Sequence, residues 1–460
     1  MLPRPVTCAP RDIQAAAAEA AAMVEFDREG SEAESSELSE IVELPNIEES
    51  FESVESRSEF TLIDSVDSWV YPPPMAVGSI GDMMMLGEHE YDNSPQHSKP
   101  RQNESNHVLV REASYSGREK GIITLACDME HRGRGRVCVT GASGFLASWL
   151  IKRLLLSGYH VIGTVRDLGK KKKYEYLWSL EGATERLQLV QADLMEEGSF
   201  DNAIMGCKGV FHVASPVLNT ISDPKSEILE PAVKGTLNVL RSCGKNPALG
   251  RVVLTSSSST LRLRDDFDPN TPLDESSWSS LEICEKLQAW YAMAKTQAER
   301  AAWEYCKEKG INLVTVLPSF IIGPSLPPNL CSTASDVLGL LKGETKRFQL
   351  LGRMGYVHID DVALCQILVY ENEDSHGRYL CSSTVMGEDD LASLLANRYP
   401  TLPISKRFEK LDRPHYELNT GKLRSLGFKF KSVEEMFDDC IASLVKQGHV
   451  TLHQGHGPIE

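Results

Sequence analysis

The sequence predicts an α/β protein, built on a doubly wound parallel sheet with a smaller C-terminal lobe and preceded by a disordered extension. Short apolar runs alternate with helical segments from Gly135 onward, and a glycine-rich turn joins the first run to the first helical segment. The first 133 residues lack this alternation. We therefore divide the chain into an extension at 1–133, a sheet-forming part at 134–325 and a lobe with C-terminal helices at 326–460.

The composition is that of a globular chain. Of 460 residues, 41% are hydrophobic and 25% are charged, which excludes collagen-like, mucin-like and wholly disordered proteins. No apolar run approaches the roughly 18 residues that a membrane span needs, and the N-terminus lacks the order of a secretory signal. We therefore expect a cytoplasmic protein with no membrane span. Its 11 cysteines include no Cys-x-x-Cys pair, which predicts reduced thiols rather than disulfides or a metal site.

Almost all of the net charge of −17 lies in the N-terminal extension. Residues 1–100 hold 21 Asp and Glu against 5 Lys and Arg, whereas the remaining 360 residues hold 44 against 43. The acidity therefore says nothing about what the globular part binds. Between Glu29 and Asp67 the chain is mostly Ser and Glu, which bury too little apolar area to offset the entropy lost on ordering. Within the extension we expect one helix, in the alanine-rich stretch from Arg11 to Val24.

The extension resembles part of another family. Leu2-Pro3-Arg4-Pro5 and Arg11 to Gln14 are similar to the segment that follows the DNA-contacting sheet of ethylene-response-factor transcription regulators, and Leu62 to Asp67 is similar to the acidic regions in their C-terminal halves. The basic, aromatic strands with which that family reads DNA are missing, so we expect no nucleic-acid binding. The resemblance implies a fragment joined to another protein, by gene fusion or by an error in the gene model.

Six apolar runs from residue 136 onward predict strands that are buried on both faces. They are residues 136–140, 160–165, 187–192, 210–214, 251–255 and 313–318. Intervening segments such as 145–157 and 227–243 are long enough for the crossover helices of a parallel sheet. The alternation loosens from about Leu326, which predicts a smaller mixed lobe over the carboxyl edge of the sheet.

The first strand runs into a glycine turn that suits a dinucleotide. Gly141, Gly144 and Ala147 have the GxxGxxA spacing between a strand and a helix start. Glycine lets the backbone approach a pyrophosphate, which then lies on free N–H groups at the helix N-terminus. We predict that Gly141, Ser143, Gly144 and Phe145 bind a dinucleotide, which makes residues 134–325 a Rossmann part.

The ends of the next strands indicate which dinucleotide. A carboxylate after the second strand would bind the ribose of NAD, but this chain has Arg166 and then Lys170 to Lys173, which suit the 2′-phosphate of NADPH. The alternative is that these lysines are merely solvated. Asp193 and Leu194 are expected to flank the adenine, and Val213, Ala214 and Ser215 to line the inner wall of the cofactor site.

Tyr291 and Lys295 form the most specific pattern in the sequence. Residues four apart share a helix face, so both side chains can reach one site. The pKa of a free phenol is about 10, which is too high for an efficient acid at neutral pH, and a neighbouring ammonium lowers that pKa. The alternative is that Tyr291 and Lys295 are an exposed pair without a catalytic role. The serine-rich strand end that precedes them in the sequence favours a catalytic role.

That strand end reads Leu254-Thr255-Ser256-Ser257-Ser258-Ser259. A hydroxyl there can hydrogen-bond a substrate carbonyl, but four consecutive serines leave open which one does so. His212 and His358 lie in buried strands and are expected to be structural. No cluster of metal ligands competes with the Tyr291 and Lys295 pair.

Together these residues resemble the extended short-chain dehydrogenase/reductases, in the plant branch of dihydroflavonol reductases and cinnamoyl-CoA reductases. The resemblance covers residues 135–450. Within that branch, residues 192–201, 254–260 and 326–336 are similar to the tetraketide α-pyrone reductases, whereas residues 432–440 match the last helix of the whole branch.

The resemblance implies that NADPH reduces a ketone on a tetraketide α-pyrone made from a fatty acyl starter, in sporopollenin biosynthesis for the pollen exine. It is compatible with association with polyketide synthase enzymes and with a place at the endoplasmic reticulum surface. The roles that it implies are a catalytic serine at Ser257, a proton donor at Tyr291, a tuning ammonium at Lys295, phosphate-reading cations at Arg166 and Lys173, and a nicotinamide contact at Pro318.

Three alternatives stay open. A dihydroflavonol reductase would share the mechanism, since one sequence does not show which ring system fits the pocket expected from Leu261 to Trp290. Cinnamoyl-CoA reductases carry Asn-Trp-Tyr-Cys-Tyr-Gly-Lys where this chain has Ala289 to Lys295, which disfavours a CoA thioester. A transcription-regulating or scaffolding protein would act through the acidic extension, which has no counterpart in the reductases. The intact Ser257, Tyr291 and Lys295 argue against that reading.

Overall fold

The computed structural model describes residues 134–215, 223–266, 268, 270–405, 408 and 415–452. The predicted disorder of residues 1–133, the helix expected from Arg11 to Val24 and the segments that resemble ethylene-response factors lie outside the described residues.

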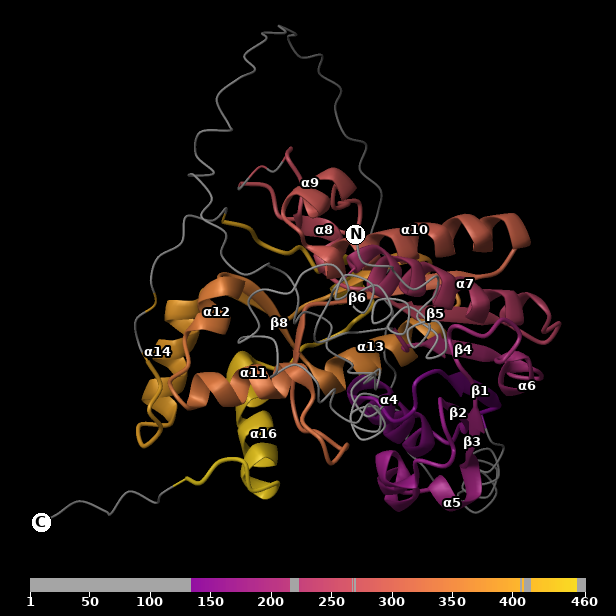
Figure 1. The fold of residues 1–460 in the computed structure, drawn as a ribbon, viewed down its shortest axis with the longest axis horizontal. Coiled ribbons are helices and arrows are strands. Elements are labelled where there is room, and N and C mark those ends of the chain that lie inside the picture. The colour runs from indigo at the N-terminus through magenta and orange to yellow at the C-terminus, as the bar shows by residue number, and fades with distance from the viewer. Residues whose placement is uncertain are drawn as a thin grey trace, which may run out of the picture. The chain divides into compact units, whose positions relative to one another are not determined.

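A parallel sheet of seven strands forms the centre of the fold (Figure 1), in the order β3-β2-β1-β4-β5-β6-β9. Its strands are β1 (Arg136–Val139), β2 (His160–Val165), β3 (Leu187–Gln191), β4 (Gly209–His212), β5 (Arg251–Thr255), β6 (Leu313–Pro318) and β9 (Gly377–Cys381). The predicted doubly wound parallel sheet is confirmed, and each of its six predicted strands is present with ends shifted by at most two residues. The seventh strand, β9, comes from beyond residue 326.

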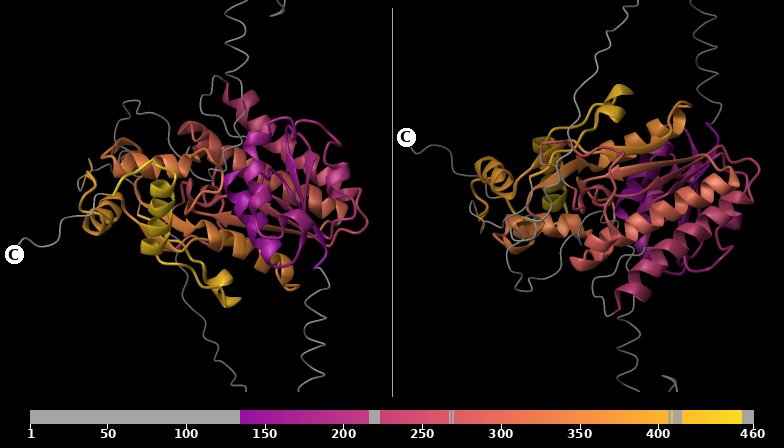
Figure 2. Two further views of the ribbon diagram at one scale, coloured as in Figure 1. Left: turned by 90° about the horizontal axis from the view of Figure 1, so that it is seen from below. Right: turned by 90° about the horizontal axis from the view of Figure 1, so that it is seen from above.

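Helices cover both faces of this sheet (Figure 2). On one face α4 (Phe145–Leu156) packs against α13 (Ile359–Glu371), and on the other α7 (Glu230–Gly244) packs against α10 (Trp290–Lys309). The apolar strand residues divide between these two layers, because alternate side chains of a strand point to opposite faces. The helix expected at residues 227–243 begins at Glu230, since Pro231 has no N–H to donate to the preceding turn, and a π-helical turn, η4 (Lys225–Leu229), comes before it.

A second sheet of three strands builds the lobe, in the order β10-β8-β7. These strands are β7 (Phe320–Ile322), β8 (Met354–His358) and β10 (Thr384–Met386). Phe320, Phe348, Tyr356 and Phe437 form edge-on ring contacts in its core, with centroids 5.8–6.1 Å apart. The helices around this core are α11 (Ser332–Leu341), α12 (Lys346–Leu351), α14 (Glu388–Arg398) and α16 (Val433–Lys446).

The remaining elements of the described residues are short. They are η2 (Lys171–Lys173), η3 (Glu175–Ser179), α5 (Ala183–Arg186), α6 (Asp201–Ile204), α8 (Ser259–Arg262), α9 (Leu281–Lys286) and α15 (Gly421–Ser425). The cysteines of the described residues are all buried thiols. Within the described ranges, no helix combines the length and the apolar character that crossing a membrane requires.

Asp361 in the first turn of α13 predicts a pH effect on stability. Its side chain is buried, and one carboxylate oxygen accepts the Lys431 N–H at 2.8 Å. Burial raises the pKa of Asp361 to about 6, against a smaller opposite effect of that hydrogen bond. The folded state therefore binds more protons than the unfolded state between about pH 4 and 6, so ionisation of Asp361 lowers stability as the pH rises through this window.

Asp361→Asn should therefore raise the free energy of unfolding at pH 7 by about 1–3 kcal/mol, because the amide keeps an acceptor for Lys431 without a buried charge. Denaturant titrations at pH 7 and pH 4 would measure this, and the gain should shrink at pH 4. The exposed Asp390→Asn is the matched control. An Asp361→Asn protein less stable than the parent at pH 7 would contradict the prediction.

Candidate active site

The glycine turn after β1 is as tight as the sequence predicts. Gly141 has a φ of +73°, and a Cβ at this position would lie 3.1 Å from the Cβ of Ala214. Its N–H donates to Thr164 Oγ1 at 3.2 Å, and its carbonyl accepts the Gly144 N–H at 2.9 Å. Gly144 is the N-cap of α4. The first N–H groups of α4 thus face the carboxyl edge of the sheet, where an anion can bind them.

Thr140, the residue before this turn, joins the ends of β1 and β4. Its Oγ1 accepts the N–H groups of Val213 and Ala214 at 3.1 and 3.0 Å and lies 2.9 Å from His212 Nδ1. With both lone pairs used, the Thr140 hydroxyl donates to Nδ1, which puts the imidazole proton on Nε2. Burial, and then the positive charge of Lys295, lower the pKa of His212 to about 3. His212 is therefore neutral and structural, as predicted.

The other residues predicted to bind the cofactor gather at the same edge of the sheet. Phe145 is buried in the first turn of α4, and the half-buried Ser143 receives the hydroxyl of Tyr176 on its carbonyl at 2.9 Å. Arg166 directly follows β2 and is half-buried, whereas Lys173 lies exposed in η2. Both cations therefore lie beyond the carboxyl end of β2.

The ends of β3, β4 and β6 carry the remaining predicted residues. Asp193 closes a turn after β3 by accepting the Met195 N–H at 2.8 Å, and Leu194 packs over Gly235 of α7. Ser215 is the last described residue after β4, and Pro318 ends β6. Because these strands are parallel, all of their carboxyl ends meet at one edge of the sheet.

The three predicted catalytic residues come together at the end of β5. Tyr291 is the second residue of α10 and only 4% exposed, and Lys295 lies one turn further along the same face. Lys295 Nζ is 5.9 Å from the centre of the Tyr291 ring and donates to the carbonyl of Thr255, the last residue of β5, at 3.3 Å. Ser257 follows two residues later, fully buried, and its hydroxyl accepts the Ser259 N–H at 3.1 Å.

This arrangement links the catalytic residues to the cofactor edge. The carbonyl of Pro318 accepts the Ser258 N–H at 2.9 Å, so the end of β6 is tied to the turn that carries Ser257. A phenol, an ammonium and a hydroxyl thus lie at the carboxyl end of β5, on the same edge of the sheet as the glycine turn after β1. Such a set can donate a proton to a substrate oxygen while a hydroxyl holds that oxygen.

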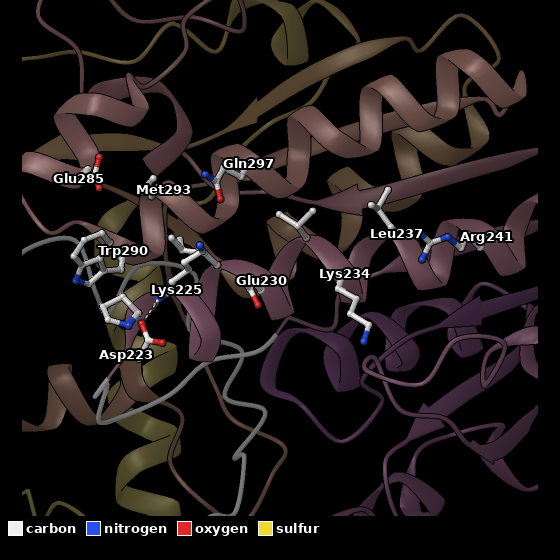
Figure 3. Close-up of a pocket in the computed structure, with 13 residues that line it drawn as sticks. Asp223, Lys225, Glu230, Lys234, Leu237, Arg241, Glu285, Trp290, Met293 and Gln297 are labelled. Carbon is white, nitrogen blue, oxygen red and sulfur yellow. Dashed lines mark hydrogen bonds between the residues drawn. The ribbon is translucent and has the colours of Figure 1, made fainter. Parts of the chain in front are cut away.

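A groove of about 890 Å³ lies on the outer side of α7 and α10 (Figure 3). The residues that line it include the apolar Leu229, Val233, Leu237 and Met293 and several acids and bases. Trp290, which precedes Tyr291, contributes to it. None of its described lining residues is a predicted catalytic residue, so the groove lies beside the catalytic set rather than at it.

Sequence comparison agrees with this architecture. The family model described as "NAD dependent epimerase/dehydratase family" matches residues 137–381, from β1 to the end of β9. The matched range contains every residue predicted to bind the cofactor or to act in catalysis.

Individual relatives extend the comparison. The chain is 70% identical to "Tetraketide alpha-pyrone reductase 1" of Arabidopsis thaliana, over 70% of this chain and 98% of the relative. It is 39% identical to a "Dihydroflavonol 4-reductase" of Zea mays, over 70% of this chain and 92% of that protein. A solved structure of the yeast methylglyoxal/isovaleraldehyde reductase Gre2 with NADPH superimposes with a TM-score of 0.61 at 26% identity, covering 68% of this chain and 100% of Gre2.

The match therefore takes in the glycine turn, the seven parallel strands and the helix that carries Tyr291 and Lys295. On this ground the chain belongs to the NAD dependent epimerase/dehydratase family, that is, to the extended short-chain dehydrogenase/reductases.

Proposed function

We propose that this protein is an oxidoreductase that uses NADPH to reduce a ketone on a tetraketide α-pyrone made from a fatty acyl starter, in sporopollenin biosynthesis. The observation that carries the chemistry is the convergence of Ser257, Tyr291 and Lys295 at the carboxyl end of β5. The substrate class is supported by the 70% identity to a tetraketide α-pyrone reductase, against 39% to a dihydroflavonol reductase.

The residues at the sheet edge fit NADPH. The positive φ of Gly141 and the N-terminus of α4 offer backbone N–H groups to the pyrophosphate, and Arg166 and Lys173 offer cations to the 2′-phosphate. Asp193 and Leu194 would border the adenine. We propose that the cofactor is also contacted by Ser143, Phe145, Val213, Ala214, Ser215, Tyr291, Lys295 and Pro318.

Three side chains carry the chemistry of the protein itself. Bound NADPH would supply the hydride that converts the carbonyl carbon to a carbinol carbon. Tyr291 donates its phenolic proton to the ketone oxygen, and Ser257 holds that oxygen by a hydrogen bond. The Lys295 ammonium favours the phenolate left on Tyr291 and can bind the nicotinamide ribose.

The chemistry of the substrate suggests where the protein works. A tetraketide pyrone is the product of a polyketide synthase, so we propose that the reductase associates with such synthases. A cytoplasmic location at the surface of the endoplasmic reticulum would bring the reductase close to fatty acyl starters.

NADPH oxidation by the full chain tests this function, with a tetraketide α-pyrone, a dihydroflavonol and cinnamoyl-CoA offered separately and with NADH as the alternative coenzyme. We expect turnover of the pyrone with NADPH. Turnover of the dihydroflavonol or the thioester without the pyrone would overturn the substrate assignment, and equal rates with NADH would overturn the assigned roles of Arg166 and Lys173.

A further inference from the structure

Beneath the catalytic residues lies a buried carboxylate that the mechanism does not use. Glu299 lies on α10 one turn beyond Lys295, and its side chain is 1% exposed. Its two oxygens accept the hydroxyl of Ser256 at 2.6 Å, the hydroxyl of Thr315 at 2.8 Å and the Nε–H of Arg378 at 2.9 Å.

Arg378 is buried with it, on the edge strand β9. Its guanidinium lies 3.7 Å from the centre of the Trp278 ring, and it donates to the carbonyls of Glu275 and Ser277. A further N–H donates to Thr260 Oγ1 at 2.7 Å. Arginine can make such planar contacts in several directions at once, which a lysine cannot.

These contacts hold the turn that carries Ser257 on both sides. Before Ser257, the Ser256 hydroxyl is bound to Glu299. After it, the Thr260 hydroxyl donates to the Ser257 carbonyl at 2.8 Å while it accepts from Arg378. Glu299 shares its helix with Tyr291 and Lys295, so one ion pair connects the serine turn to the helix of the proton donor.

A buried ion pair is a poor way to gain stability alone, because taking both charges out of water costs as much as their attraction returns. It does impose a geometry, since only one arrangement satisfies every donor and acceptor. We infer that Glu299 and Arg378 are positioning residues that hold Ser257 in register with Tyr291 and Lys295; this inference rests on the proposed function.

Steady-state kinetics on the full chain test the inference by comparing Glu299→Gln in the parent and in a Ser257→Ala background. In the parent, we expect kcat to fall by about 10- to 100-fold with the Kd of NADPH changed less than about threefold, because the cofactor edge is intact. In the Ser257→Ala background, the same change should cost less than about threefold, because the group being positioned is gone. Equal losses in both backgrounds would overturn the inference.

Hydrogen exchange at residues 258–261 gives a readout that does not depend on activity. Glu299→Gln, or Arg378→Lys if the first variant fails to fold, should speed exchange in this turn by about tenfold or more, since local opening becomes easier. Glu304→Gln, an exposed acid on the same helix, is the matched control and should leave exchange unchanged. Unchanged exchange in the Glu299 and Arg378 variants would contradict the inference. A parent protein that reduces no pyrone, but whose turn responds in this way, would contradict only the proposed function.

Discussion

Tyr291→Phe is expected to lower kcat for pyrone reduction by about 10²- to 10⁴-fold, the range that a positioned general acid contributes. The substitution removes only the hydroxyl and keeps the buried ring. The Kd of NADPH should therefore change little. Steady-state rates and a fluorescence titration with NADPH would measure the two effects separately.

Tyr305→Phe is the matched control for this prediction. Tyr305 lies on the same helix, about 20 Å along its axis from Tyr291, and its hydroxyl faces Gly244 of α7. This variant should keep its full rate. Retained turnover in Tyr291→Phe would exclude Tyr291 as the proton donor.

Asp360→Ala is expected to lower the free energy of unfolding by about 2–4 kcal/mol. Asp360 in α13 accepts the indole N–H of Trp149 at 2.7 Å and forms a two-pronged ion pair with Arg153, both on α4. Its side chain is 7% exposed, while that of Arg153 is 33% exposed, so partial solvation of the arginine keeps the loss below that of a fully buried pair. Denaturant titration would measure the change.

The pH dependence of the difference in unfolding free energy between the parent and Asp360→Ala gives a second check. Burial raises the pKa of Asp360, but the hydrogen bonds from Arg153 and Trp149 outweigh it, and the pKa ends below its ordinary value. The contribution of Asp360 is therefore present at neutral pH and is lost as the pH falls through that lowered pKa.

The exposed Glu304→Ala should change stability by less than about 0.5 kcal/mol. A loss below about 1 kcal/mol for Asp360→Ala at pH 7 would contradict the account.

The fold was largely predictable because strands that are buried on both faces have continuous apolar sequences. β9 could not be predicted in the same way, since its sequence Gly377–Cys381 carries an arginine whose burial depends on Glu299, far away in the chain. The three-stranded sheet of the lobe was likewise not assigned, because β7 and β10 have three residues each and show no clear period.

The candidate site was predictable where local geometry determines it. The four-residue spacing of Tyr291 and Lys295 places both on one helix face, and in the structure Lys295 donates to the carbonyl of Thr255, two residues before Ser257. Glu299 repeats that spacing from Lys295, which was a usable signal. Its partners Ser256, Thr315 and Arg378 become visible only when α10 is packed against β5, β6 and β9.

The central claim is a net reduction by NADPH, and isotope transfer tests it most directly. The full chain would be incubated with the tetraketide α-pyrone and NADPH that carries deuterium at both C4 positions of the nicotinamide, and the product examined by mass spectrometry. We predict one deuterium on the carbinol carbon for each NADPH consumed. An unlabelled product, or an isomerised pyrone formed without consumption of NADPH, would contradict the claim.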